Sequence, residues 1–159
     1  MARFEMKGVF PASRDDLWKL LWMHWYRDDV TLSEIHPEII SRKIVSQGVD
    51  IVYKGLTYNA STVDEREIKL RGKISSSSWK IDSSPPDKVR LEVVESSGPV
   101  VKGSYFENLY SEVPGGTQVS TKVDIVLHGV PGLFQGWVIR RALNRADKQD
   151  LHYLNKMKL

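Results

Sequence analysis

Residues 103–127, GSYFENLYSEVPGGTQVSTKVDIVL, decide the fold class. Two runs rich in aromatic and β-branched residues flank Pro114-Gly115-Gly116, which is the pattern of an antiparallel hairpin. The register that this turn imposes pairs Glu112 with Thr117, Tyr110 with Val119, Asn108 with Thr121, Phe106 with Val123, and Glu107 with Lys122. An ion pair on one face and aromatic-aliphatic pairs on the other indicate a sheet that is solvated on one side. The residues expected to face inward are Phe106, Asn108, Tyr110, Val119, Thr121, Val123 and Ile125.

A long helix is predicted after this hairpin. Pro131-Gly132 ends the sheet, and Leu133 to Lys158 contains no Pro and no Gly after Gly136, which allows about seven helical turns. Its apolar stripe consists of Ile139, Leu143, Ala146, Tyr153, Leu154 and Met157, interrupted by Gln149 and Asp150. The opposite side carries Arg140, Arg141, Arg145 and Lys148. Such a face is usually solvated, although it has the charge to meet an anionic lipid surface or RNA.

Residues 42–127 are predicted to form six consecutive antiparallel strands, with turns at Gln47-Gly48, Ser84-Pro85-Pro86-Asp87 and Gly98-Pro99. The alternation of Phe4 and Met6 with charged residues predicts one further strand at the start of the chain. The apolar positions change parity between Ile74 and Trp79, which predicts a β-bulge within Ser75 to Ser78.

Two short helices are expected between the first and second strands. Ser13, followed by Asp15 and Asp16, is a typical helix start. The residues that follow at helical spacing are Leu17, Trp18, Leu21, Trp22 and Trp25. Asp28 and Asp29 interrupt this stripe, and Thr31 to Ile40 is expected to hold a second short helix or turn. Tryptophans on one helix face pack in a core or border a cavity mouth, and both interpretations stay open.

This order of elements resembles the START-like superfamily, also called SRPBCC. The resemblance is carried by FEMKGVFPASRDDLWKLL at residues 4–21, HPEIISRKIVSQG at residues 36–48, the hairpin and the final helix. It implies one α+β domain over residues 1–159 with the helix-grip fold. In that fold a curved, seven-stranded antiparallel sheet wraps around a long C-terminal helix. It also implies a deep cavity between sheet and helix, open near the two short helices.

A cavity also follows from shape, because a strongly curved sheet cannot lie flush against one straight helix. The inward residues mix large side chains with small or polar ones, which is unusual for a fully packed core. The residues predicted to bind a ligand are Trp22, Trp79, Phe106, Asn108, Tyr110, Thr121, Val123, Ile139, Leu143 and Ala146.

Several kinds of chemistry have no motif in the sequence. The chain has no cysteine, and His24, His36, His128 and His152 lack metal-ligand spacing. The serine run lacks a nucleophile elbow, and the glycines match no nucleotide-binding pattern. We therefore predict no catalytic residue, no metal and no cofactor. A net charge of +3 with a pI near 9.1 is too small an excess to predict DNA binding. With no apolar span of about 20 residues and no signal peptide pattern, a cytoplasmic location is expected.

The leading functional hypothesis is binding or carriage of an apolar small molecule, such as a lipid, a polyketide or an isoprenoid-like compound. The first alternative is a cyclase or dehydratase of the same superfamily, in which Asn108, Thr121 or a nearby Tyr polarises a carbonyl. The sequence shows no buried acid-base pair, which weakens this alternative. The second alternative is an interaction module that contacts the ribosome or a membrane through the basic helix. No feature of the sequence points to a particular oligomeric state.

Overall fold

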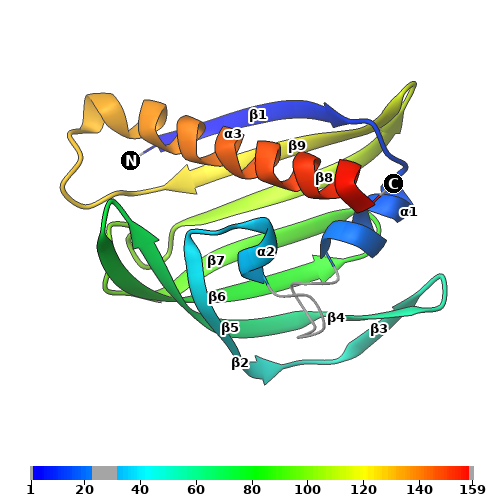
Figure 1. Ribbon diagram of the computed structural model, residues 1–159, viewed down its shortest axis with the longest axis horizontal. Helices are drawn as coiled ribbons and strands as arrows, with labels where there is room; N and C mark the ends of the chain where they lie inside the picture. The colour runs from blue at the N-terminus through cyan, green and yellow to red at the C-terminus, as the bar shows by residue number, and fades with distance from the viewer. Residues whose placement is uncertain (1, 23–31, 158–159) are drawn as a thin grey trace.

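The architecture is a curved antiparallel sheet with one long helix across its concave side (Figure 1). The structure, a computed structural model, describes residues 2–22 and 32–157, apart from the side chain of Trp22. The seven strands lie in the order β1-β9-β8-β7-β6-β5-β2. Their bounds are β1 Ala2–Phe10, β2 Ile39–Gln47, β5 Ser61–Leu70, β6 Lys73–Ser84, β7 Lys88–Ser96, β8 Tyr105–Val113 and β9 Gly116–Ile125. The predicted α+β helix-grip fold is confirmed.

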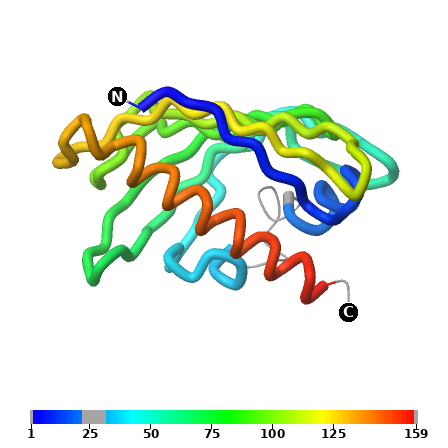
Figure 2. The backbone as a smooth tube through the Cα atoms, turned by 90° about the horizontal axis from the view of Figure 1, so that it is seen from above, coloured from blue at the N-terminus to red at the C-terminus, as the bar shows by residue number. Residues whose placement is uncertain are grey.

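The long helix is α3, Gly132–Met157. It begins one residue before the predicted start, and the predicted last residue, Lys158, lies outside the described residues. The two short helices between β1 and β2 are also present. The first is α1 (Arg14–Leu17), which continues directly into the π-helical turn η1 (Trp18–Trp22), and the second is α2 (Leu32–Ile35). Ser13 caps α1, with its hydroxyl accepting a hydrogen bond from the Asp16 amide. Figure 2 shows α2 beside the C-terminal half of α3.

The last hairpin has the predicted register. Phe106 lies opposite Val123, Asn108 opposite Thr121 and Tyr110 opposite Val119. The inward face is buried as expected, with Phe106 partly buried. Strand β1 adds to the outer edge of β9, pairing Ala2 with Ile125 and Phe10 with Thr117.

Two details of the sheet differ from the prediction. A separate hairpin of β3 (Asp50–Tyr53) and β4 (Leu56–Asn59) stands between β2 and β5, and it was not predicted. Its turn is Lys54-Gly55, where both residues have positive φ, 49° and 79°. Because Lys seldom occupies this conformation, the turn has a weak sequence signal.

The β-bulge was predicted on the wrong strand. Strand β6 pairs regularly with β5 throughout, whereas Ser78 pairs with Glu95 and Trp79 with Val93. The extra residue is therefore Val94 on β7. The parity argument failed because Ile74 is on the outer face, 60% exposed, and did not mark the inward side.

Trp18 anchors the larger of two core clusters. Its ring meets Tyr58 and Tyr110 edge to face, at centroid distances of 5.5 and 5.6 Å, and its indole N–H donates to the Pro86 carbonyl at 2.8 Å. A buried indole needs such an acceptor. Trp18 is therefore a packing residue, while Trp25 and the side chain of Trp22 lie outside the described residues.

Candidate functional site

A cavity of about 240 Å³ lies between the sheet and α3. The first helices reach it through Leu17 and Leu21, and His36 follows α2 into its wall, so it extends to the two short helices as expected. The apolar part of the lining is Met6, Phe10, Leu17, Leu21, Ile39, Ile68, Trp79, Phe106, Tyr110, Val119, Leu143 and Ala146. The polar part is His36, Glu38, Arg66, Asn108, Thr121, Asp147 and Asp150.

Most of the residues predicted to bind a ligand line this cavity. They are Trp79, Phe106, Asn108, Tyr110, Thr121, Leu143 and Ala146. Val123 and Ile139 do not line it. They pack with Ala2 and Ile125 in the second core cluster, where α3 lies against β1 and the space between helix and sheet is filled. The side chain of Trp22 is outside the described residues.

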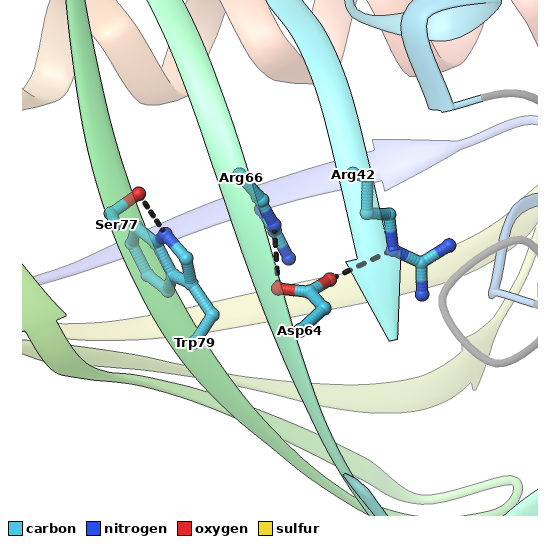
Figure 3. Close-up of polar contacts among 5 residues, drawn as sticks. All are labelled: Arg42, Asp64, Arg66, Ser77 and Trp79. Atoms are coloured by element: carbon cyan, nitrogen blue, oxygen red, sulfur yellow. Dashed lines mark hydrogen bonds and ion pairs between the residues drawn. The ribbon is translucent and has the colours of Figure 1, made fainter. Parts of the chain in front are cut away.

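A buried cluster of three ions, Arg42, Asp64 and Arg66, lies on β2 and β5 (Figure 3), and its Arg66 lines the cavity. Asp64 on β5 is fully buried and accepts hydrogen bonds from Arg66 Nε at 2.9 Å and Arg42 Nε at 2.8 Å. The Arg66 and Arg42 side chains are 5% and 6% exposed. Burial lowers the pKa of Arg66 and the Asp64 carboxylate opposes this, but arginine stays charged in proteins. Two guanidinium groups therefore share one buried carboxylate.

Arg66 connects this cluster to the aromatic wall. Its guanidinium lies 5.2 Å from the centre of the Trp79 ring, and the Trp79 indole N–H donates to Ser77 Oγ at 2.9 Å (Figure 3). Trp79 in turn packs edge to face on Phe106. The cation and the rings fix one another in place, because a guanidinium over an indole face is held by the ring quadrupole.

His36 forms the second polar group of the wall. It is 6% exposed, its Nε2 lies 3.1 Å from Asp150 Oδ1, and its Nδ1 lies 2.6 Å from Gln149 Oε1. Both partners offer acceptor oxygens, so both ring nitrogens act as donors in a protonated imidazole. Burial acts to lower the pKa of His36, but Asp150, Gln149 and Glu38 outweigh it and the pKa is raised. For Asp150, burial raises the pKa and His36 opposes the rise.

The sequence-based expectation of no buried acid-base pair is therefore wrong. The imidazole and the side chains that it meets on α3 are more than a hundred residues apart in the chain, so spacing gave no indication of the pair. The available signal was the interruption of the apolar stripe of α3 by Gln149 and Asp150.

Asp147 lies one helical turn before these residues and also lines the cavity. The residue is exposed, yet burial of its carboxyl raises its pKa to about 6, and the Asp150 charge adds to the rise. A carboxyl that titrates near neutral pH in a cavity can both accept and donate a proton.

Asn108 and Thr121 meet across the β8–β9 pair. Thr121 Oγ1 donates to Asn108 Oδ1 at 2.7 Å, which orients both side chains within the cavity wall. These two residues were predicted from the hairpin register alone.

A second hollow, of about 640 Å³, lies over β2, β5, β6 and β7. Its lining consists of serine and charged side chains, including Ser77, Glu95, Arg42 and Arg66, so Arg66 borders both this hollow and the cavity. Because it is wide open and polar, apolar burial offers little driving force for a ligand there.

No group of three or more metal-ligating side chains is assembled among residues 2–22 and 32–157. In the same ranges, no helix has the length and apolar character required to cross a bilayer.

Comparison with known proteins finds solved structures with the same fold. No family model matches the sequence, and no curated protein matches it. Among solved structures, Ara h 8.0201 has a TM-score of 0.71 at 19% identity, covering 98% of both chains. The Zhui aromatase/cyclase from Streptomyces sp. R1128 has a TM-score of 0.67 at 15% identity, covering 96% of this chain and 90% of that one. A START superfamily protein from Mycobacterium smegmatis has a TM-score of 0.65 at 12% identity, covering 98% of both. Identities this low show a shared fold and carry no activity across.

Proposed function

We propose that this chain, which has the START/SRPBCC-like helix-grip fold, binds an apolar small molecule in the cavity between its sheet and α3. The observation that carries the proposal is the cavity itself, about 240 Å³ with an aromatic and aliphatic lining, in the place where the resemblance to the START-like superfamily implies one. The neighbours support the same class of function, since they include an aromatase/cyclase and a START superfamily protein.

The size of the cavity limits the ligand. An engineered apolar cavity of about 150 Å³ takes up benzene, and typical ligand sites begin at about 300 Å³. A volume of about 240 Å³ therefore suits a compound of one or two rings, or a short isoprenoid or acyl segment. Apolar burial would contribute about 25 cal/mol for each Å² removed from water, before ordering costs.

The polar groups of the wall favour a ligand that carries oxygen. Arg66 brings a guanidinium group to one side of the cavity, and guanidinium N–H groups suit a carbonyl, phenolate or carboxylate oxygen. Asp147 and Asp150 bring carboxyl oxygens to the cavity from α3. A plain hydrocarbon would make no hydrogen bond to these groups.

A second candidate function is that of a cyclase or dehydratase, and a specific observation favours keeping it. Asp147 has a pKa of about 6 and shares the cavity with the Arg66 guanidinium. In an intramolecular aldol step, a carboxylate such as Asp147 would remove the proton α to a carbonyl. The new carbon-carbon bond would form at a second carbonyl polarised by Arg66, and water would leave afterwards.

Binding is tested with the neutral two-ring fluorescent probe 6-acetyl-2-dimethylaminonaphthalene, which carries a carbonyl oxygen, and two matched variants. Ala146→Phe fills the cavity, and we expect it to weaken probe binding by about tenfold or more while lowering stability by less than about 1 kcal/mol. Ala142→Phe places the same side chain at an exposed position one turn earlier on α3, outside the cavity lining, and should leave binding unchanged. Native mass spectrometry of the gently purified protein should show a bound compound that denaturation releases.

Different experimental results are expected for a binding protein, for an enzyme, and for a protein with neither function. No probe binding by the unaltered protein, with a loss of about 1–3 kcal/mol in Ala146→Phe from overpacking, would refute the binding proposal. Conversion of a linear poly-β-ketone by the unaltered protein but not by Asp147→Asn would establish the enzyme. Binding of the probe without conversion of the poly-β-ketone would indicate a binding or carrier protein.

A further inference from the structure

The first two turns of α3 expose three large apolar side chains. Leu133 is 94% exposed, Phe134 56% and Trp137 61%. A single exposed apolar residue is ordinary, but a leucine and two aromatic rings within five positions form a patch that a protein in water rarely presents without a partner.

A second protruding element resembles this one. The turn between β5 and β6 exposes Leu70 (47%) and Ile74 (60%). Figures 1 and 2 both place this turn and the start of α3 at the same end of the molecule, opposite the β3–β4 hairpin. We call the two elements together the apolar end.

The two segments that form the apolar end contain only basic charges. Residues 69–74 contain Lys69, Arg71 and Lys73 and no acidic residue. Residues 132–146 contain Arg140, Arg141 and Arg145 and no acidic residue. All six basic residues are exposed. Arg141 lies 5.4 Å from the Trp137 ring, so a positive charge directly adjoins an exposed aromatic side chain.

Exposed aromatic and aliphatic side chains with basic neighbours match the surface of an anionic lipid bilayer. Tryptophan and phenylalanine enter the boundary between headgroups and acyl chains, while arginine and lysine meet the lipid phosphates. A nucleic acid would account for the basic residues but not for Leu133, Phe134 and Trp137.

We propose that the apolar end docks on an anionic lipid bilayer, with the first two turns of α3 inserted at the headgroup level. This surface is separate from the cavity, so the proposal does not depend on the function proposed above. If the cavity does bind a ligand, docking would bring its helical wall to the lipid.

Vesicle co-sedimentation tests the docking. One set of vesicles consists of phosphatidylcholine alone, and in the other about a third of the lipid is phosphatidylserine. We expect the protein to bind the anionic vesicles at least about tenfold more strongly, and to release as salt is raised. Phe134→Ser/Trp137→Ser should lower this partitioning about tenfold or more. The matched control Val49→Ser/Val52→Ser removes two equally exposed apolar residues at the opposite end and should bind like the unaltered protein.

A charge variant provides an independent measurement. Arg71→Gln/Lys73→Gln alters only the β5–β6 turn and should weaken binding about fivefold for each charge removed. Unchanged circular dichroism and melting temperature would show that each variant is folded. The proposal is overturned if anionic vesicles are not bound, or if the Phe134/Trp137 variant binds them normally. Binding to single-stranded RNA that competes with vesicles and persists in that variant would assign the surface to nucleic acid instead.

Discussion

Asp64 is a buried carboxylate that accepts hydrogen bonds from two buried guanidinium groups, those of Arg42 and Arg66. Asp64→Asn keeps the side-chain shape but removes the negative charge to which two buried guanidinium groups donate. We expect the free energy of unfolding to fall by about 3–5 kcal/mol, the usual cost of breaking a buried pair from one side. Urea denaturation measures this loss.

The control for Asp64→Asn is Asp82→Asn on the adjacent strand. The Asp82 side chain is 43% exposed and lies 3.9 Å from Lys80, so its loss should change stability by less than about 1 kcal/mol. Equal small effects in both variants would mean that the guanidinium groups reach water, contrary to their burial.

At the residue scale, strand parity was sufficient to predict part of the cavity wall. It placed Trp79, Asn108 and Tyr110 on the inward side, where the structure has them. It was not applied to Asp64 and Arg66, although both share the parity of Ile68. Charged residues on a strand usually face solvent. Only the three-dimensional structure shows that Asp64 and Arg66 face inward and form an ion pair.

At the level of elements, His36 joins the segment after α2 to α3 through Asp150 and Gln149. Its raised pKa means that its stabilising contribution is complete below its ordinary pKa of about 6.5 and is lost as the pH rises through the raised value. We therefore expect His36→Gln to destabilise the protein by about 1–3 kcal/mol near pH 6 and by less near pH 9. Urea unfolding at the two pH values measures the difference.

The same substitution at His152, which is exposed on α3, is the control and should have little effect at either pH. A His36→Gln effect that is equal near pH 6 and pH 9 would show that the imidazole acts as a neutral hydrogen-bonding group.

The elements themselves were largely predictable, because each has a local signal. Ser13 marks the start of α1, Pro131-Gly132 precedes α3, and Pro114-Gly115 sets the register of β8 and β9. The β3–β4 hairpin has only the weak turn Lys54-Gly55. Contacts between elements, such as that of His36 with α3, depend on packing and have no local signal.

For the whole molecule, the order of elements predicted the helix-grip arrangement and hence a space between sheet and helix. The extent of that space could not be predicted, because it depends on where α3 approaches the sheet. Ile139 lies where the helix meets β1 and the space is filled, while Leu143 and Ala146 lie further along, where the cavity is open.

The pairing of β1 with β9 has a consequence for how the chain reaches this structure. β1 pairs with a strand more than a hundred residues later in the chain, since Ala2 pairs with Ile125 and Phe10 with Thr117. Contacts so distant in sequence require a large loop to close before they contribute, which slows folding.

We expect refolding from urea to take milliseconds to seconds, as measured by tryptophan fluorescence in stopped flow. Completion within microseconds would indicate a nucleus that does not need this pairing. During synthesis, β1 therefore lacks its partner strand until the residues of β9 have been made.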